Sequence, residues 1–381
     1  MTSHVRPARV LRIAERTLSR PTAPYREGAV IAWVREFAAA RPRLALHEDP
    51  DGNLELVRRF VPRSRAPLVL AAHMDHPGFR ALASRRARDR FAIEALFLGG
   101  VRPEYFPGAR VCFFPAGDAV RAKVRRARPR RGALRVELEA KRAVPPGAFG
   151  MWDLPAFRRS PRDPDLLLTR AADDLAGVAA ILALLDAVER IDPRRRVDVR
   201  GLFTRAEEVG FVGALAVARG GRLPRAARIV AIEASKALPG APQGAGPILR
   251  VGDRASSFDD GLGRWIARVG ERLAGVRGQR FAFQRKLMDG GTCESTAYQL
   301  WGYRCAAMCL ALGNYHNMSE RGRIAVESIR LSDLVGLVRF FEGLVRFDAD
   351  APRPGRPDPL RQRLERRFAR ARRELGRDPF A

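Results

Sequence analysis

The sequence predicts an α/β protein: a mostly parallel, mixed sheet flanked by helices, with a small all-β, barrel-like domain inserted into it. Three observations predict this fold. Continuous apolar runs alternate with helical periodicity over residues 1–76 and again from residue 166, and only short alternating segments lie between. The composition is that of a globular chain, with 46% apolar residues, 34 Gly and 27 Pro among 381 residues.

Charge and cysteine content narrow the classes of protein further. The net charge is +28, and only four of the 70 basic residues are lysine. A coding preference for arginine accounts for that pattern, although such a charge also attracts anionic partners. Four cysteines without a Cys-x-x-Cys pair indicate neither a zinc knuckle nor a disulfide framework. With no readable signal peptide and no apolar run long enough to span a bilayer, we expect a cytoplasmic protein.

The first 76 residues contain two predicted helices and three predicted strands. Helical periodicity covers residues 7–19 and 25–40, and a turn at 49–53 joins strands at 44–47 and 54–57. The apolar run 67–72 has the length of a parallel strand buried on both faces, and it leads directly to His73. Because ligands bind beyond the carboxyl ends of such strands, His73 is a candidate site residue.

Residues 77–165 have a different texture. They contain short alternating segments separated by turn residues, without a convincing long helix. The segments lie at 79–83, 91–98, 109–114, 119–124 and 134–138. This pattern predicts an inserted β barrel or sandwich.

From residue 166, strands and helices alternate again. Four apolar runs are predicted as strands, at 166–172, 197–203, 226–232 and 303–312. An amphipathic helix is expected from Asp174 to about Val188, and a further helix from Phe211 to Ala218. A polar group follows each apolar run: Asp173, then the pair Glu207 and Glu208, then Glu233 and finally His316.

With His73, five predicted strands thus lead to a potential ligand. Two imidazoles and three carboxylates, with one carboxylate to spare, form a ligand set for two divalent ions. Taken singly, each position has an ordinary explanation. Glu207 and Glu208 fit a solvated helix start, and His73 with Asp75 fits a loop histidine near an acid. The recurrence of the same relative position favours a metal site.

Six motifs in collinear order resemble the tetrahedral aminopeptidase branch of the di-zinc metallopeptidases, which includes glutamyl and deblocking aminopeptidases, and the resemblance covers about Thr17 to Arg346. The motifs are AAHMDHPGF, AADDLAGVA, RAEEVGFVGA, AIEAS, GGTCESTA and NYHNMSE. The resemblance implies that His73 and Glu233 hold one ion, Glu208 and His316 the other, and that Asp173 bridges them. It also implies that Asp75 orients His73 and that Glu207 is the general base.

The resemblance further implies two divalent ions per subunit, with zinc expected and cobalt or manganese able to substitute. It implies peptide substrates and a homo-oligomer assembled through the insert. Two departures concern specificity: Glu233 stands where this branch usually has Asp, and Cys293-Glu294 stands where it usually has Asp-Ala. A Glu at the first position is more typical of carboxypeptidases and deacylases. Cys293 is interpreted as a small packing residue, with metal ligation the alternative.

The sequence therefore predicts a metal-dependent exopeptidase that removes N-terminal residues from peptides. An N-acyl amino acid deacylase or carboxypeptidase with the same site is the alternative, and a basic nucleic-acid-binding protein is the alternative from another class. Residues 1–76 and 166–350 are expected to form the peptidase core around the insert at 77–165. Residues 351–381 are expected to form a basic linker and helix, which either packs on protein or reaches an anionic surface. No specific nucleic acid and no membrane span are expected.

Overall fold

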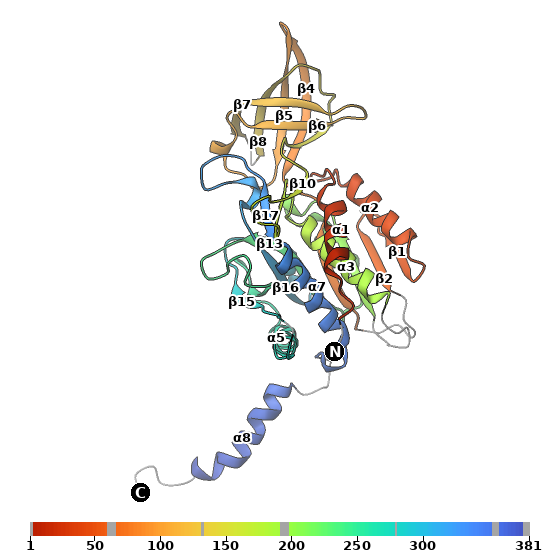
Figure 1. The fold of residues 1–381 in the computed structure, drawn as a ribbon, viewed down its shortest axis with the longest axis vertical. Helices are drawn as coiled ribbons and strands as arrows, with labels where there is room; N and C mark the ends of the chain where they lie inside the picture. The colour runs from red at the N-terminus through yellow and green to blue at the C-terminus, as the bar shows by residue number, and fades with distance from the viewer. Residues whose placement is uncertain are drawn as a thin grey trace.

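The computed structural model describes residues 3–58, 66–130, 133–190, 198–278, 280–352 and 358–375, without the side chains of Arg130 and 371–375. An eight-stranded mixed sheet forms the centre of the molecule, and a closed six-stranded barrel stands above it (Figure 1). This arrangement confirms the predicted fold class.

The central sheet has the strand order β1-β2-β12-β3-β13-β16-β14-β15. Its strands are β1 (Leu44–Glu48), β2 (Leu54–Arg58), β12 (Val199–Thr204), β3 (Leu68–His73), β13 (Arg228–Lys236), β16 (Arg304–Leu312), β14 (Ile248–Gly252) and β15 (Gln284–Leu287). The four central strands β12, β3, β13 and β16 run parallel to one another. Their carboxyl ends therefore lie at one edge of the sheet.

Strand β3 is buried on both faces, as its continuous apolar run predicts. Leu68, Leu70 and Ala72 pack in the larger core, which contains apolar side chains of α1, α2, α3, α5 and α7. The alternate residues Val69 and Ala71 face the opposite way, toward α4 and α6. The helices are α1 (Pro7–Leu18), α2 (Gly28–Ala39), α3 (Leu175–Val188), α4 (Val212–Gly220), α5 (Asp260–Ala274), α6 (Glu294–Leu300) and α7 (Leu331–Arg346).

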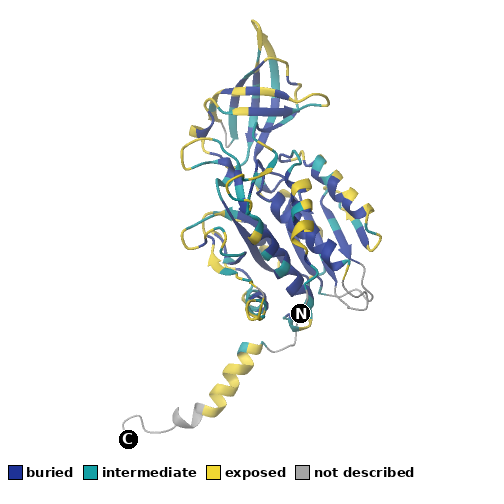
Figure 2. Ribbon diagram, in the orientation of Figure 1, coloured by how far each residue is buried: buried dark blue, intermediate teal, exposed yellow. Residues whose placement is uncertain are grey.

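Helix α3 corrects one expectation. The sequence predicts an amphipathic helix here, but all fourteen residues of α3 are buried (Figure 2). The helix contacts α1 and α7 as well as the sheet, so no face is left for solvent. Its sequence is apolar all round for that reason, with Asp186 the single charged residue in it.

The barrel closes in the order β4-β5-β8-β7-β6-β9, with every ladder antiparallel. Its strands are β4 (Gly78–Ala87), β5 (Arg90–Leu98), β6 (Arg110–Phe114), β7 (Val120–Arg130), β8 (Ala133–Ala140) and β9 (Phe149–Trp152). Aromatic rings fill the interior, and Phe79 contacts Phe97, Phe113 and Trp152 edge to face. The barrel thus has a hydrophobic core of its own.

A second small sheet joins the barrel region to the core. It has the order β10-β11-β17, from β10 (Phe157–Arg159), β11 (Leu166–Thr169) and β17 (Glu327–Arg330). Strand β11 is therefore not part of the central sheet, contrary to the idea that all five polar positions follow strands of one sheet. Glu233 likewise does not follow β13 but lies within it, because pairing with β16 continues to Lys236.

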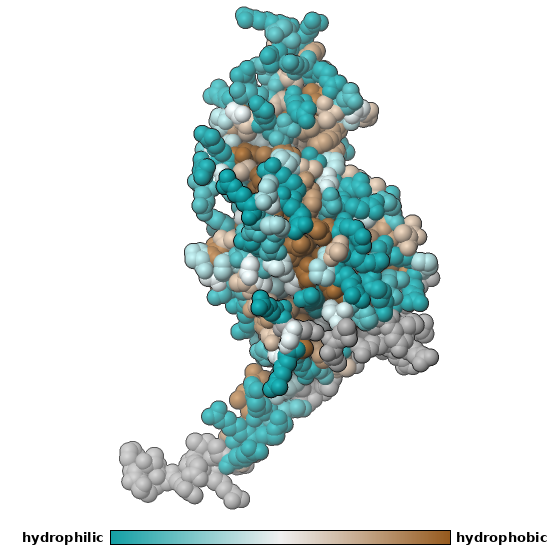
Figure 3. Space-filling model, viewed as in Figure 1, coloured by the Kyte–Doolittle hydropathy of each residue, from teal (hydrophilic) through white to brown (hydrophobic). Residues whose placement is uncertain are grey.

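The last described helix, α8 (Pro359–Leu375), extends away from the rest of the molecule (Figure 1). Residues 361–370 are exposed rather than packed in a core, and this surface is largely hydrophilic (Figure 3). Most of the predicted linker, residues 353–357, lies outside the described residues. Within the described ranges, every helix is too short or too polar to cross a membrane.

Candidate active site

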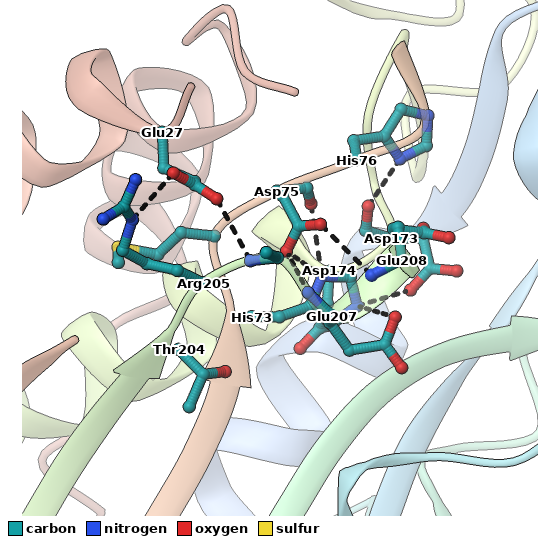
Figure 4. A network of polar contacts seen from close by, with 12 residues as sticks. Glu27, His73, Asp75, His76, Asp173, Asp174, Thr204, Arg205, Glu207 and Glu208 are labelled. Atoms are coloured by element: carbon teal, nitrogen blue, oxygen red, sulfur yellow. Dashed lines mark hydrogen bonds and ion pairs between the residues drawn. The ribbon is translucent and has the colours of Figure 1, made fainter. Parts of the chain in front are cut away.

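The predicted site residues meet at the carboxyl edge of the central sheet, and Figure 4 shows His73, Asp75, Asp173, Glu207 and Glu208 there. His73 is the last residue of β3, and Glu233 lies near the end of β13. Glu207 and Glu208 belong to η2 (Glu207–Val209), the short turn of helix after β12, while His316 belongs to η3 (Tyr315–Asn317) after β16. Asp173 lies between β11 and α3. Residues up to 243 positions apart in sequence are thus neighbours.

One group of potential ligands consists of His73, Glu207 and Glu233. Each offers a ligand atom, and these atoms lie within 4.8 Å of one another. The Nε2 atom of His73 is 4.0 Å from Glu207 Oε2 and 4.0 Å from Glu233 Oε2. Geometry alone therefore places Glu207 close enough to be either a ligand or a neighbour of the ligands.

The second group consists of Asp173, Glu208 and His316. His316 Nε2 is 3.4 Å from Asp173 Oδ2 and 3.2 Å from Glu208 Oε1. The other carboxyl oxygen of Asp173, Oδ1, is 3.5 Å from Nε2 of His73. The Asp173 carboxylate thus faces an imidazole of each group with a different oxygen.

These carboxylates fit divalent ions because each has one buried oxygen for which the described residues supply no hydrogen bond, although Asp173 Oδ1 and Glu208 Oε1 lie near the imidazoles of His73 and His316. Asp173 Oδ1, Glu208 Oε1 and Glu233 Oε1 are buried without a hydrogen bond. An unpaired buried carboxylate oxygen costs free energy unless a cation or proton compensates it. Imidazole and carboxylate form a donor set that binds zinc and related divalent metals.

The electrostatics of the site reflect the same crowding of charge. Burial raises the pKa of Glu207, and Glu233, Glu208 and Asp75 raise it further against the opposing effect of His73. Burial, with Asp173 adding to it, raises the pKa of Glu233 to about 8. For Asp173, hydrogen bonding to His316 and His73 outweighs burial and holds its pKa well below the usual range.

Asp75 lies where it can orient His73. Its carboxylate is 3.4 Å from His73 Nδ1, and its backbone carbonyl is 3.2 Å from the same nitrogen. The Asp75 carboxylate also accepts hydrogen bonds from the backbone N–H groups of Glu207, at 2.9 Å, and Glu208, at 3.2 Å. The sequence did not suggest this second contact, which ties the ends of β3 and β12 together.

Two supporting residues, His76 and Glu327, also escaped the sequence prediction. His76 contacts the backbone carbonyl of Asp173 through Nδ1, at 2.5 Å, and Asn317 Oδ1 through Nε2, at 3.1 Å. Glu327 accepts hydrogen bonds from the backbone N–H groups of Ala172, at 2.6 Å, and Asp173, at 3.3 Å. Both side chains are fully buried and hold the segment that carries Asp173. His76 stands inside a quoted motif and could have been found, whereas Glu327 follows no recognisable pattern.

The loop from Thr204 to Phe211 is held from the other side by α2. Glu27, just before α2, accepts hydrogen bonds from the backbone N–H of Ala206, at 3.1 Å, and from Arg205 Nε, at 2.8 Å (Figure 4). Ala206 and Phe211 have the positive φ values 51° and 57°, which few residues other than glycine adopt readily. External contacts such as those of Glu27 and Asp75 stabilise this strained loop.

Cys293-Glu294 differs from the pattern that the resemblance implies, but it does not place a thiol in either group of potential metal ligands. Cys293 is buried in a small apolar cluster with Phe258 and Ala307, in agreement with a packing role. No cysteine belongs to the potential ligand groups that the described residues form. Glu294 accepts a 2.5 Å hydrogen bond from the hydroxyl of Thr204, and burial raises its pKa to about 7. Glu294 therefore supports the end of β12 through Thr204.

Comparisons with known proteins agree with this geometry. The profile of the M42 glutamyl aminopeptidase family matches residues 133–331. No curated protein sequence matches the chain.

Solved structures of archaeal peptidases share the fold. A TET aminopeptidase from a marine sediment archaeon of the Thaumarchaeota has a TM-score of 0.73 at 18% identity, covering 89% of this chain and 96% of its own. An aminopeptidase from Desulfurococcus kamchatkensis has a TM-score of 0.72 at 21% identity, covering 89% and 95%. The TET1 peptidase of Pyrococcus horikoshii, described as assembling into a tetrahedron or a large octahedral shell, has a TM-score of 0.70 at 19% identity, covering 88% and 99%.

The fold, the clustered ligands and the family match together define the class: the chain is a metal-dependent aminopeptidase. More particularly, it belongs to the M42 glutamyl aminopeptidase family, whose profile spans more than half of its length. The resemblance noted in the sequence is thereby confirmed.

Proposed function

We propose that the protein removes N-terminal residues from peptides at a site that holds two divalent ions. The observation that carries this proposal is the position of Asp173 between the two ligand groups. Its Oδ1 lies 3.5 Å from Nε2 of His73, and its Oδ2 lies 3.4 Å from Nε2 of His316. A carboxylate placed in this way can serve two ions at once, which is the arrangement that co-catalytic sites require.

The proposed ligands follow from the two groups. His73 and Glu233 would hold one ion, Glu208 and His316 would hold the other, and Asp173, which faces both groups, would serve both. The unpartnered buried oxygens of Asp173, Glu208 and Glu233 support this assignment. The bound ions would polarise the scissile carbonyl and lower the pKa of water at the site. Zinc is the expected metal, and cobalt or manganese suit the same donors.

Glu207 is the proposed general base. Its carboxylate is buried beside the potential ligands, and burial raises its pKa, which makes the group a better proton acceptor than an exposed glutamate. Glu207 would take the proton from the attacking water and deliver it to the leaving amine. Asp75 is a positioning residue, because it contacts His73 and holds the backbone of Glu207.

The assembly and setting of the protein are also proposals. We propose a homo-oligomer in which the insert, residues 77–165, carries subunit contacts, while residues 1–76 and 166–350 form the peptidase core. The separate barrel core and the assembly described for the Pyrococcus horikoshii relative support this view. We also retain the predicted cytoplasmic setting, which the four cysteines support because none of them forms a disulfide.

Metal analysis combined with a substrate panel tests the function. We expect purified protein to contain two divalent ions per subunit and to hydrolyse aminoacyl nitroanilides. Chelation should abolish hydrolysis, and addition of zinc, cobalt or manganese should restore it. N-acyl amino acids and N-blocked peptides belong in the same panel, because a glutamate at the position of Glu233 is more typical of deacylases and carboxypeptidases. Hydrolysis of only these substrates would overturn the proposed aminopeptidase specificity.

A further inference from the structure

A cleft of about 950 Å³ lies next to the second ligand group. Its walls come from the loop between η3 and β17, from the end of β13, and from the segment that follows β5 of the barrel. In Figure 1 the β17 loop lies beneath the barrel, and Met318 and Ile324 of this loop pack against the barrel core. The cleft therefore lies where the barrel meets the peptidase core.

The cleft lies beside the proposed site, and Tyr315 connects the two. Tyr315, which lines it, stacks on the imidazole of His316 with ring centroids 3.8 Å apart and planes inclined by 21°. Lys236, which also lines the cleft, is the last residue of β13, the strand that carries Glu233. A molecule bound in this cleft would thus lie next to His316.

The lining carries a large excess of positive charge. Four cations, Arg102, Lys236, Arg321 and Arg323, face a single carboxylate of Glu320. Arg102 pairs with Glu104, at 3.2 Å. Among the residues that the structure describes, Lys236, Arg321 and Arg323 have no ion-pair partner, and all three are exposed. Cations gathered along a concave wall focus the field and attract an anionic ligand.

The loop that carries two of these cations is held in a defined turn. The backbone N–H and the hydroxyl of Ser319 both donate to the carbonyl of Arg323, at 3.0 and 2.6 Å. The backbone N–H of Arg323 returns a bond to the Ser319 hydroxyl, at 3.3 Å. These bonds use backbone atoms of Arg323, so its guanidinium remains available to a ligand.

An aminopeptidase needs such a cleft for the remainder of its substrate. One residue precedes the scissile amide, and all following residues must leave the site by an open path. A volume of this size accommodates several residues. We propose that the cleft binds the peptide beyond the scissile bond and favours acidic side chains there, through Lys236, Arg321 and Arg323. The inference rests on the proposed function and adds a preference for acidic peptides.

Two peptides of equal size separate charge from shape. We would compare Leu-Ala-Glu-Glu-Glu-Ala with Leu-Ala-Gln-Gln-Gln-Ala, measuring release of leucine and the resulting kcat/KM. Binding of C-terminally fluorescein-labelled versions to chelated protein, by fluorescence anisotropy, gives a readout that does not depend on turnover. We expect the acidic peptide to bind about tenfold more tightly at low salt. Each exposed ion pair between peptide and cleft contributes little on its own, so a few pairs together give a difference of about this size. The difference should shrink as salt is added.

The matched variants are Arg321→Gln/Arg323→Gln in the cleft and Arg219→Gln/Arg222→Gln at the end of α4. Both remove two exposed arginines, but neither of the second pair lines the cleft. The cleft variant should lose most of the preference for the acidic peptide, measured as the ratio of the kcat/KM values and of the affinities for the two peptides. The α4 variant should retain the preference.

Each outcome has a distinct meaning. Equal binding of the two peptides, or an equal loss of preference in both variants, would overturn the inference, since attraction would then come from net charge alone. Failure to release leucine from either peptide would instead contradict the proposed function. The anisotropy measurement would still decide whether the cleft selects acidic peptides.

Discussion

The candidate site depends on carboxylates that have more than one neighbour. Asp173 faces His73 and His316 with separate oxygens, while its backbone is fixed by His76 and Glu327. Each ligand position is therefore set by contacts from another part of the chain. A substitution of a supporting residue should change the site by moving a ligand rather than by removing one.

Glu207→Gln tests whether Glu207 is the general base or a metal ligand. We expect kcat to fall by about 10²–10⁴-fold, since general base catalysis contributes on this order, while the metal content is retained. The matched variant Glu208→Gln should lose one ion per subunit. Both are measured by steady-state kinetics and by elemental analysis of the purified variants. Turnover close to that of the unmodified protein would contradict the base assignment, and loss of an ion from Glu207→Gln would make Glu207 a ligand.

At the scale of elements, the loop after β12 is positioned by the helix that follows it. The backbone N–H of Gly213 in α4 donates to the carbonyl of Arg205, at 2.8 Å. Asn53 joins the same contact by accepting from the N–H of Arg205 and donating to the carbonyl of Gly213. The loop that presents Glu207 and Glu208 therefore rests directly on the start of α4.

Gly213→Ala should disturb this contact without unfolding the protein. A Cβ at Gly213 would lie 2.5 Å from the backbone of Arg205 and 2.4 Å from Asn53 Oδ1, so the loop must shift. We expect kcat/KM to fall roughly tenfold or more, because small displacements of catalytic groups are costly. Gly220→Ala, in the same helix with open space around it, is the control and should keep full activity. Equal activity of both variants would contradict the proposed support.

A cluster of ion pairs around Asp186 joins α1, α3 and the segment that follows α2. The Asp186 carboxylate in α3 accepts from Arg9 of α1 at 3.0 Å, Arg41 just after α2 at 2.8 Å, and Arg190 at 2.8 Å. Burial favours the neutral acid, but these hydrogen bonds outweigh it and hold the pKa of Asp186 below its usual value. The ionised form thus stabilises the packing of α1, α2 and α3.

Asp186→Asn should lower the free energy of unfolding by about 1–3 kcal/mol at pH 7, the contribution of hydrogen bonds to a charged group. Because the folded pKa is depressed, this stabilisation is present above the unfolded pKa of about 3.9 and disappears as pH falls through the folded value. Denaturant unfolding at pH 7 and at stepwise lower pH measures it. Asp89→Asn, in an exposed turn, should change stability by less than about 0.5 kcal/mol. A constant difference between Asp186→Asn and the parent down to pH 3 would contradict this account.

At the scale of the whole molecule, the site joins segments from most of the chain. The potential ligands lie in β3 and β13, in the turns after β12 and β16, and just before α3, so repulsion among the buried acids would act on the entire core. Bound ions would remove that repulsion and stabilise the folded chain by mass action.

Chelation should therefore lower the thermal midpoint by about 5 °C or more, since ligands that bind only the folded state raise stability. Differential scanning fluorimetry with and without a chelator, followed by addition of zinc, measures this shift. Asp173→Asn is the comparison, and its midpoint should respond much less to the chelator. An identical midpoint for the chelated and the loaded protein would contradict a structural contribution of the ions.

The sequence by itself determined the strands β1, β2, β3, β12, β13 and β16 of the central sheet and the existence of the barrel, but not β14 or β15, and it supplied a set of candidate ligands. The period and the apolar content of a run are local properties of the sequence, so the run before His73 predicts β3 without knowledge of its neighbours. Short elements with weaker patterns, such as β9 and β10, were not predicted. The domain boundaries and residue roles stay predictions.

Only the tertiary structure decided which atoms meet. The burial of α3 on all sides, the position of Glu233 inside β13, and the contacts of His76 and Glu327 depend on how distant segments pack. Two residues far apart in sequence come together only when strand order and register bring them to one edge, and no periodicity records that order. The sequence therefore names the ligands, whereas the fold sets their distances and supplies the cleft beside them.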